Sequence, residues 1–190
     1  MPLGMTHGVL RISPCIASPP TPAPNDAHPH RLTAPSALLG FSLMADVNDP
    51  CLGCAIVSGA TRPVGGVITR APGLVLHGVA GPSPVRGWVV ISSERHLRGL
   101  YELDEATARE LGALAARVMR AQREVLGAEH AYAFAIGDVL RHFHLHLVPR
   151  FADTPSRLWG RAVFEATPAE HLPPEPLEAA ARALAAALAR

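Results

Sequence analysis

The chain has 190 residues, of which 48% are apolar and 17% charged, and its formal net charge is +1. This length suits one domain with extensions, and the near-neutral charge excludes the basic surface with which proteins hold duplex nucleic acid. No apolar run reaches the length of a membrane span, and no signal-peptide pattern opens the chain. Three cysteines, two of them close together, do not resemble a disulfide framework. We therefore expect a cytoplasmic protein without membrane or duplex nucleic acid partners.

Residues 1–43 differ in composition from the rest of the chain. Nine of the 19 prolines fall within the first 50 residues, including the run SPPTPAP at 18–24. Proline removes backbone donors and prevents regular structure, so this segment is predicted to be a disordered arm. A compact domain is expected over 44–160, beginning at Met44, and a C-terminal extension with a helix over 161–190.

Short β-branched runs separated by turn residues follow the arm and predict antiparallel strands. They lie near 64–69, 73–79 and 87–92, and two further strands are expected near 131–136 and 141–148. Between these groups, a stripe of leucine, alanine and valine predicts a long helix from Asp104, a good N-cap, to Leu126, with Gly127 ending it. A last helix is expected from about Glu175. This order of elements predicts the α+β class with a mostly antiparallel sheet.

Residues 141–150 read RHFHLHLVPR and hold the most informative pattern of the chain. Because successive side chains of a strand point to opposite faces, a strand here places three histidines on one face and three apolar side chains on the other. The histidines are His142, His144 and His146, and the apolar residues are Phe143, Leu145 and Leu147. Pro149 is expected to end the strand because it lacks a backbone donor.

The row of histidines has three interpretations: a solvated polar face, a three-histidine metal site, or a source of nucleophilic imidazole. Threonine, serine or lysine would make a solvated face equally well, so this interpretation is the weakest. Neutral imidazole is a common zinc ligand. With a pKa near 6.5, it is also mostly neutral and nucleophilic at physiological pH.

The pattern resembles the signature of the histidine triad (HIT) superfamily, in which three histidines alternate with apolar residues. Pro149-Arg150 extends the likeness, as do the segment RGWVVI at 86–91 and the following Arg95-His96. Cys51-Leu52-Gly53-Cys54 resembles the Cys-x-x-Cys of zinc-containing members. The likeness covers 51–150. It implies a HIT domain over 44–160 with a five-stranded antiparallel sheet, a long helix and pairing into a homodimer.

The resemblance also implies an activity. The middle histidine, His144, would attack the α-phosphorus of a nucleotide and form a covalent nucleotidyl-histidine, which water or another acceptor resolves. His146 would contact the phosphate and help the leaving group depart. A backbone carbonyl on the other ring nitrogen of His144 would fix its tautomer. The implied partner is a small nucleotide substrate, either a nucleoside phosphoramidate or a dinucleoside polyphosphate, and the implied class is a nucleotide hydrolase or nucleotidyl transferase.

A zinc site follows from the same resemblance. Its ligands would be Cys51, Cys54, His96 and His142. Two thiolates and two imidazoles suit a tetrahedral zinc ion that is closed to solvent, so the metal would be structural. A redox pair or two core thiols also fit the cysteines, and a surface histidine also fits His96.

Three positions depart from the family pattern. Many members have a histidine where Trp88 stands, a glutamine where Asp138 stands and a hydroxyl where Val139 stands, and these groups support the active site or contact the phosphate. An aspartate beside a phosphate would repel it unless protonated or paired. These changes keep open a catalytically weak nucleotide-binding or scaffolding module and, more distantly, a metal-dependent hydrolase with a three-histidine site. His77, outside the motif, is interpreted as incidental.

Overall fold

The computed structural model describes residues 51–190. The predicted arm over 1–43 and the predicted domain start at Met44 therefore lie outside the described residues. Within the described part of the chain, no helix is both long enough and apolar enough to cross a lipid bilayer.

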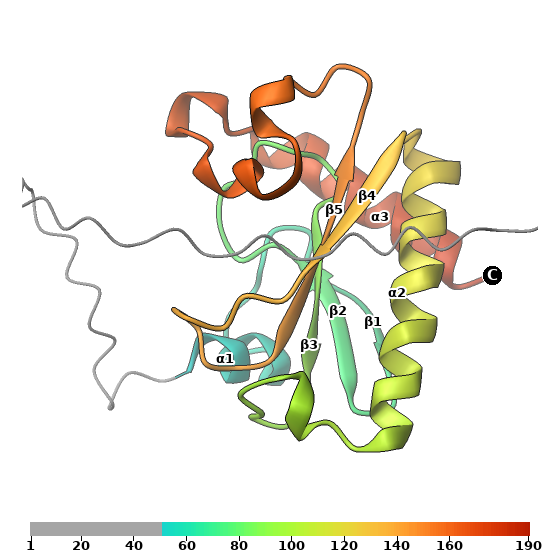
Figure 1. The fold of residues 1–190 in the computed structure, drawn as a ribbon. Helices are drawn as coiled ribbons and strands as arrows, with labels where there is room; N and C mark the ends of the chain where they lie inside the picture. Colours follow the sequence, from blue (N-terminus) through green and yellow to red (C-terminus); the bar gives the residue numbers. More distant parts are fainter. Residues whose placement is uncertain (1–50) are drawn as a thin grey trace, which may run out of the picture. The chain divides into compact units, whose positions relative to one another are not determined.

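Five strands form one antiparallel sheet, as the sequence predicted (Figure 1). In chain order they are β1 (Val67–Ala71), β2 (Leu74–Gly78), β3 (Val89–Ser93), β4 (His130–Phe134) and β5 (His144–Arg150). Their order across the sheet is β1-β2-β3-β5-β4. The histidine-bearing strand β5 thus lies between β3 and β4 and pairs with both. Along the chain, β3 and β4 are separated by the long helix.

Three α-helices accompany the sheet: α1 (Leu52–Ser58), α2 (Glu105–Leu126) and α3 (Pro174–Leu188). Asp104 caps α2, because its carboxylate accepts a 2.8 Å hydrogen bond from the backbone N–H of Thr107. Gly127 ends the helix with φ 76°, a left-handed conformation that favours glycine. The long helix and the C-terminal helix confirm their predictions, whereas α1 was not expected from the sequence.

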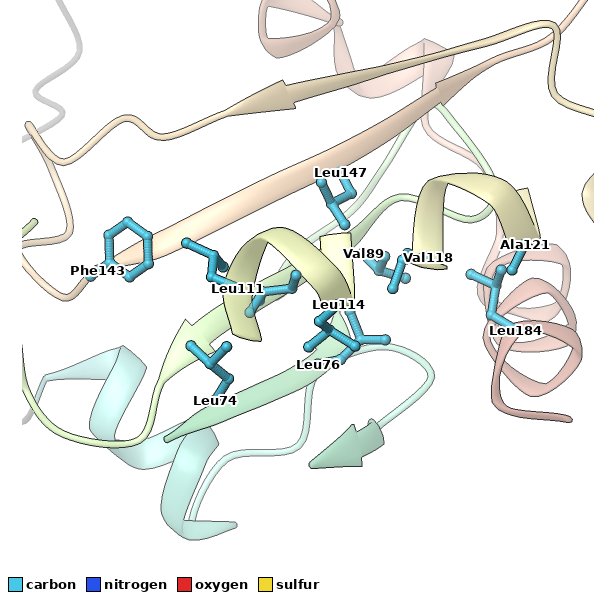
Figure 2. Packing of buried hydrophobic residues seen from close by; sticks show 11 residues of the cluster. Leu74, Leu76, Val89, Leu111, Leu114, Val118, Ala121, Phe143, Leu147 and Leu184 are labelled. Atoms are coloured by element: carbon cyan, nitrogen blue, oxygen red, sulfur yellow. The ribbon is translucent and has the colours of Figure 1, made fainter. Parts of the chain in front are cut away.

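The main core lies between one face of the sheet and helix α2 (Figure 2). Buried leucine and valine side chains of α2 pack on the inward side chains of β2, β3 and β5, and Leu184 of α3 joins them. Phe143 and Leu147 belong to this cluster and Leu145 packs against it, which confirms the predicted apolar face. Because this core covers one face, the histidines of β5 lie on the opposite face.

Two predictions about the histidine segment are wrong. The strand begins at His144 instead of Arg141, so His142 precedes it, and the strand runs through Pro149 to Arg150. Pro149 is tolerated because pairing with β3 has already ended at Leu147, opposite Val89. On the other side, the Arg150 carbonyl accepts from the N–H of Glu129 at 2.9 Å. The missing N–H of Pro149 therefore faces no ladder partner.

Candidate functional site

The register of the sheet collects histidines on its outer face. His77 of β2 lies opposite Val90, which in turn lies opposite His146 of β5. His144 lies opposite Ser92 in the same ladder. Directly opposed residues share a face of a sheet, so three histidines from two strands lie together. The sequence interpretation of His77 as incidental missed this, because a pairing between distant strands has no signal in the local pattern.

His144 is held by the backbone immediately before it. Its Nδ1 lies 2.6 Å from the carbonyl oxygen of His142. A carbonyl only accepts, so Nδ1 carries the proton and the lone pair of the neutral ring is on Nε2. This is the tautomer-fixing carbonyl that the resemblance implied and that the sequence could not identify.

His146 lies against His144 and two aromatic side chains. Its ring centroid is 4.9 Å from that of His144 and 5.2 Å from that of Phe164. The indole N–H of Trp88 donates to His146 Nδ1 at 3.1 Å. Burial, and secondarily the charges of His144 and His77, lower the pKa of His146 to about 4, so the ring is neutral at physiological pH.

His77 is also held as a neutral ring. It is 2% exposed, its Nδ1–H donates to the Gly78 carbonyl at 2.7 Å, and its Nε2 accepts from the Ser92 hydroxyl at 2.9 Å. Burial lowers its pKa more than the hydrogen bond to Gly78 raises it. Both nitrogens are occupied, so His77 supports the neighbouring histidines without a free atom for a substrate.

A second group of side chains adjoins the first. One ligand atom each from Cys51, Cys54, His96 and His142 lies within 4.8 Å of the other three. Cys54 Sγ is 3.3 Å from His96 Nδ1 and 3.6 Å from His142 Nδ1, and Cys51 Sγ is 3.5 Å from His142 Nδ1. Sulfur and nitrogen ligands of one tetrahedral zinc ion are about 3.5 Å apart, given typical bond lengths. The four predicted ligands therefore come together with the spacing and chemistry that zinc requires.

Local structure aims these ligands inward. Cys51 precedes α1 and Cys54 lies in its first turn, so both thiols are on one side of the helix. His142 Nε2–H donates to the carbonyl of Ser93 at 2.8 Å, which leaves the Nδ1 lone pair facing the thiols. Gly53 allows this approach, because a Cβ there would lie 2.4 Å from Cγ of His142. Burial and the neighbouring Cys51 raise the pKa of the Cys54 thiol in the absence of a metal.

An open cavity of about 370 Å³ lies beside His144. Its walls come from the turn after β3, the segment after β4 and the residues that lead into β5: Arg98, Gly99, Leu100, Tyr101, Ala135, Ile136, Gly137, His142, Phe143 and His144. Asp138 and Val139, two of the departures from the family pattern, are exposed and do not line this cavity. Their side chains thus need not meet a phosphate bound there.

Comparison with solved structures relates this geometry to a family. A zinc-bound histidine triad family protein from Mycobacterium smegmatis is 26% identical, with a TM-score of 0.57 over 73% of this chain and 93% of that one. This chain has the histidine triad fold. The family resemblance and fold class predicted from the sequence are confirmed. No protein-family model and no curated protein sequence matches the chain.

More distant histidine triad structures share the fold alone. A hypothetical histidine triad nucleotide-binding protein from Sulfolobus tokodaii is 17% identical, with a TM-score of 0.58 over 73% of this chain and 92% of that one. A Hit-like protein involved in cell-cycle regulation from Bartonella henselae, solved with an unknown ligand, is also 17% identical, with a TM-score of 0.55 over 70% and 92% of the two chains.

Proposed function

We propose that this histidine triad protein is a nucleotide hydrolase or nucleotidyl transferase in which His144 forms a covalent bond to the α-phosphorus of its substrate. The observation that carries the proposal is the 2.6 Å hydrogen bond from His144 Nδ1–H to the His142 carbonyl. It holds the ring with an unprotonated Nε2 beside an open cavity. An imidazole fixed in this way is a ready nucleophile.

The reaction then has two displacements. The Nε2 lone pair of His144 forms a bond to phosphorus while the bond to the leaving group breaks and its electron pair departs with that group. The oxygen of water, or of another acceptor, next bonds to the same phosphorus and loses its proton to solvent. The bond from phosphorus to His144 Nε2 breaks, and its electron pair returns to that nitrogen. His146, with its proton on Nε2, donates a hydrogen bond to the phosphate. One difficult displacement thereby becomes two easier ones.

Zinc would be held by Cys51, Cys54, His96 and His142, whose donor atoms fit a tetrahedral structural site. When bound, the ion supplies a crosslink between α1 and the chain entering β5. The His142 carbonyl that orients His144 belongs to one of these ligands. The metal site would thus keep the nucleophile in place without taking part in the reaction.

The sequence also left open a nucleotide-binding module and a three-histidine metal hydrolase, and the structure bears differently on each. A nucleotide-binding or scaffolding module without turnover is favoured by Trp88, which stands where many members have a histidine. A three-histidine metal hydrolase is disfavoured. The ring of His142 faces the two thiols. Among residues 51–190, the one cluster of three or more potential metal ligands is the set of two cysteines and two histidines.

The test is direct detection of the intermediate. The protein is mixed with adenosine and guanosine phosphoramidates and dinucleoside polyphosphates. The reaction is quenched, and the mass of the intact protein is measured by mass spectrometry. We expect a nucleotidyl adduct on wild type and none on His144→Ala. His130→Ala, an exposed histidine of β4, is the matched control and should keep the adduct. Turnover by His144→Ala at the wild-type rate would refute the covalent mechanism, and nucleotide binding without turnover would favour the module.

A homodimer and a cytoplasmic location remain part of the proposal. Light scattering of the purified protein should give twice the mass of one chain, and a monomer at micromolar concentration would refute the dimer. The disordered arm over 1–43 stays a prediction. The boundary at residue 160 between the domain and the C-terminal extension is also still a prediction. Limited proteolysis should remove the arm and leave a stable core.

A further inference from the structure

Trp88 and His146 form the least expected pair in the site. Trp88 is 8% exposed and its ring meets His146 edge to face, with centroids 5.6 Å apart at 75°. Phe164 closes over both rings, 5.0 Å from Trp88 and 5.2 Å from His146. The hydrogen bond from Trp88 Nε1 to His146 Nδ1, 3.1 Å long, is therefore shielded from water by apolar surface.

The direction of this hydrogen bond is not free to change. An indole nitrogen only donates, so His146 Nδ1 must accept and cannot carry a proton. A neutral imidazole has one proton, which is then on Nε2. Protonating the ring would set an N–H of His146 against the N–H of Trp88. A histidine at position 88 would permit either direction, because imidazole both donates and accepts.

The surroundings of His146 add no group that would favour a positive charge. The titratable neighbours that act on its ring are His144 on the same strand and His77 on β2. Both disfavour a positive charge on His146. Trp88 and Phe164 are uncharged. The lowered pKa of His146, about 4, agrees with the geometry. His77 has both nitrogens occupied and offers no proton of its own.

We propose that Trp88 is a positioning residue that keeps His146 as a neutral hydrogen-bond donor, and that the enzyme therefore prefers phosphoanhydrides, of the dinucleoside polyphosphate class, over phosphoramidates. The substrate preference rests on the proposed covalent reaction at His144. The tautomer of His146 does not rest on it.

The preference follows from where the electron pair goes in the first displacement. When a phosphoanhydride bond breaks, the pair stays on an oxygen of the departing phosphate, which is a stable anion and needs no proton. When a phosphoramidate bond breaks, the pair stays on nitrogen, and the amine must gain a proton to leave. A neutral His146 can stabilise the departing oxygen through Nε2–H, but it cannot give that proton away. His146 therefore cannot act as a general acid for an amine leaving group. General acid catalysis typically raises the reaction rate by about 100-fold or more.

The first experiment reads the tautomer in the resting protein by ¹⁵N NMR of histidine-labelled samples. Wild type should show His146 with an unprotonated Nδ1 and a protonated Nε2. Trp88→Phe removes the donor and keeps an aromatic ring, so His146 should become a mixture of tautomers. Trp159→Phe is the matched control. It is the chain's other tryptophan, and its indole donates to the Thr154 carbonyl instead. A protonated Nδ1 in wild-type His146 would overturn the proposal without need of any variant.

The second experiment compares leaving groups on the same nucleoside. Diadenosine triphosphate and an adenosine 5′-phosphoramidate of a primary alkylamine are assayed with wild type, Trp88→His and Trp159→Phe. We expect kcat/KM of wild type to favour the anhydride by about 100-fold, Trp159→Phe to keep that ratio, and Trp88→His to narrow it by raising phosphoramidate cleavage.

The outcomes separate the two proposals. Equal cleavage of both substrates, with an adduct on His144, would refute the preference and leave the covalent mechanism standing. No adduct and no turnover of either substrate would refute the proposed function itself. In that case the NMR result still decides the role of Trp88.

Discussion

His142 and His144 are separated by one residue, yet they are built for different chemistry. His142 uses Nε2–H to donate to the Ser93 carbonyl and presents Nδ1 to two thiols. His144 uses Nδ1–H to donate to the His142 carbonyl and keeps Nε2 free. The comparison shows that the backbone carbonyl each ring meets selects the nitrogen that remains reactive. Two identical side chains thereby offer different nitrogens, one suited to the proposed metal site and the other to the proposed nucleophile.

The largest effect should come from the nucleophile. His144→Ala removes the only atom proposed to bond phosphorus, so kcat/KM should fall by at least about a thousandfold. Zinc content should stay that of wild type, because His144 is not in the ligand set. Steady-state assays with elemental analysis of the same samples measure both. A parallel loss of zinc would show that the two histidines do not act separately.

The metal side of the comparison is tested by Cys54→Ser. Purified without added metal, wild type should contain about one zinc per chain, and the variant should contain none. Its free energy of unfolding should fall by about 2.7 kcal/mol if zinc is present at a hundredfold excess over Kd. Urea denaturation measures this, with His130→Ala as the control. Metal-free wild type with fully reactive thiols would reject the zinc site.

A smaller and more selective disturbance is Gly53→Ala. The added methyl would lie 2.4 Å from His142 Cγ, so the ring must move away from the thiols. We expect zinc affinity to weaken about 10- to 100-fold, as when a group that orients a ligand is lost. Gly112→Ala on α2 is the matched control, since nothing lies within 4 Å of its Cβ. It should raise stability by about 0.5–1 kcal/mol. Competition with a chromophoric chelator gives both affinities.

The last prediction concerns the pH dependence of stability. The pKa of His146 is about 4 when folded against 6.5 for the free side chain. Between these values the unfolded chain binds a proton that the folded chain does not, so stability falls as pH falls from 6.5 towards 4. His146→Gln should show a shallower decline over that window, although His77 still contributes in both proteins. Thermal denaturation at a series of pH values tests this. Parallel curves would contradict it.

Local patterns in the sequence were enough for much of the architecture. Asp104 and Gly127 marked the ends of the long helix, because caps depend on near neighbours. The resemblance to the histidine triad superfamily, carried by the Cys-x-x-Cys and histidine motifs, implied all four members of the cysteine and histidine cluster. The helix α1 was missed because seven residues are too few for a clear periodic signal. The end of β5 was misplaced because the effect of Pro149 depends on where β3 stops pairing.

The sequence by itself determined which residues are candidates for the chemistry, since the type of a side chain and its alternation along one strand are local properties. Only the tertiary structure decided which ring nitrogen is free in His142 and in His146. The Ser93 carbonyl that orients His142 is 49 residues away, and the indole that orients His146 is 58 residues away. A hydrogen bond of a few ångströms depends on how distant segments pack, and no local pattern encodes it. The roles of His77 and Trp88 therefore became visible only when the strands were brought together.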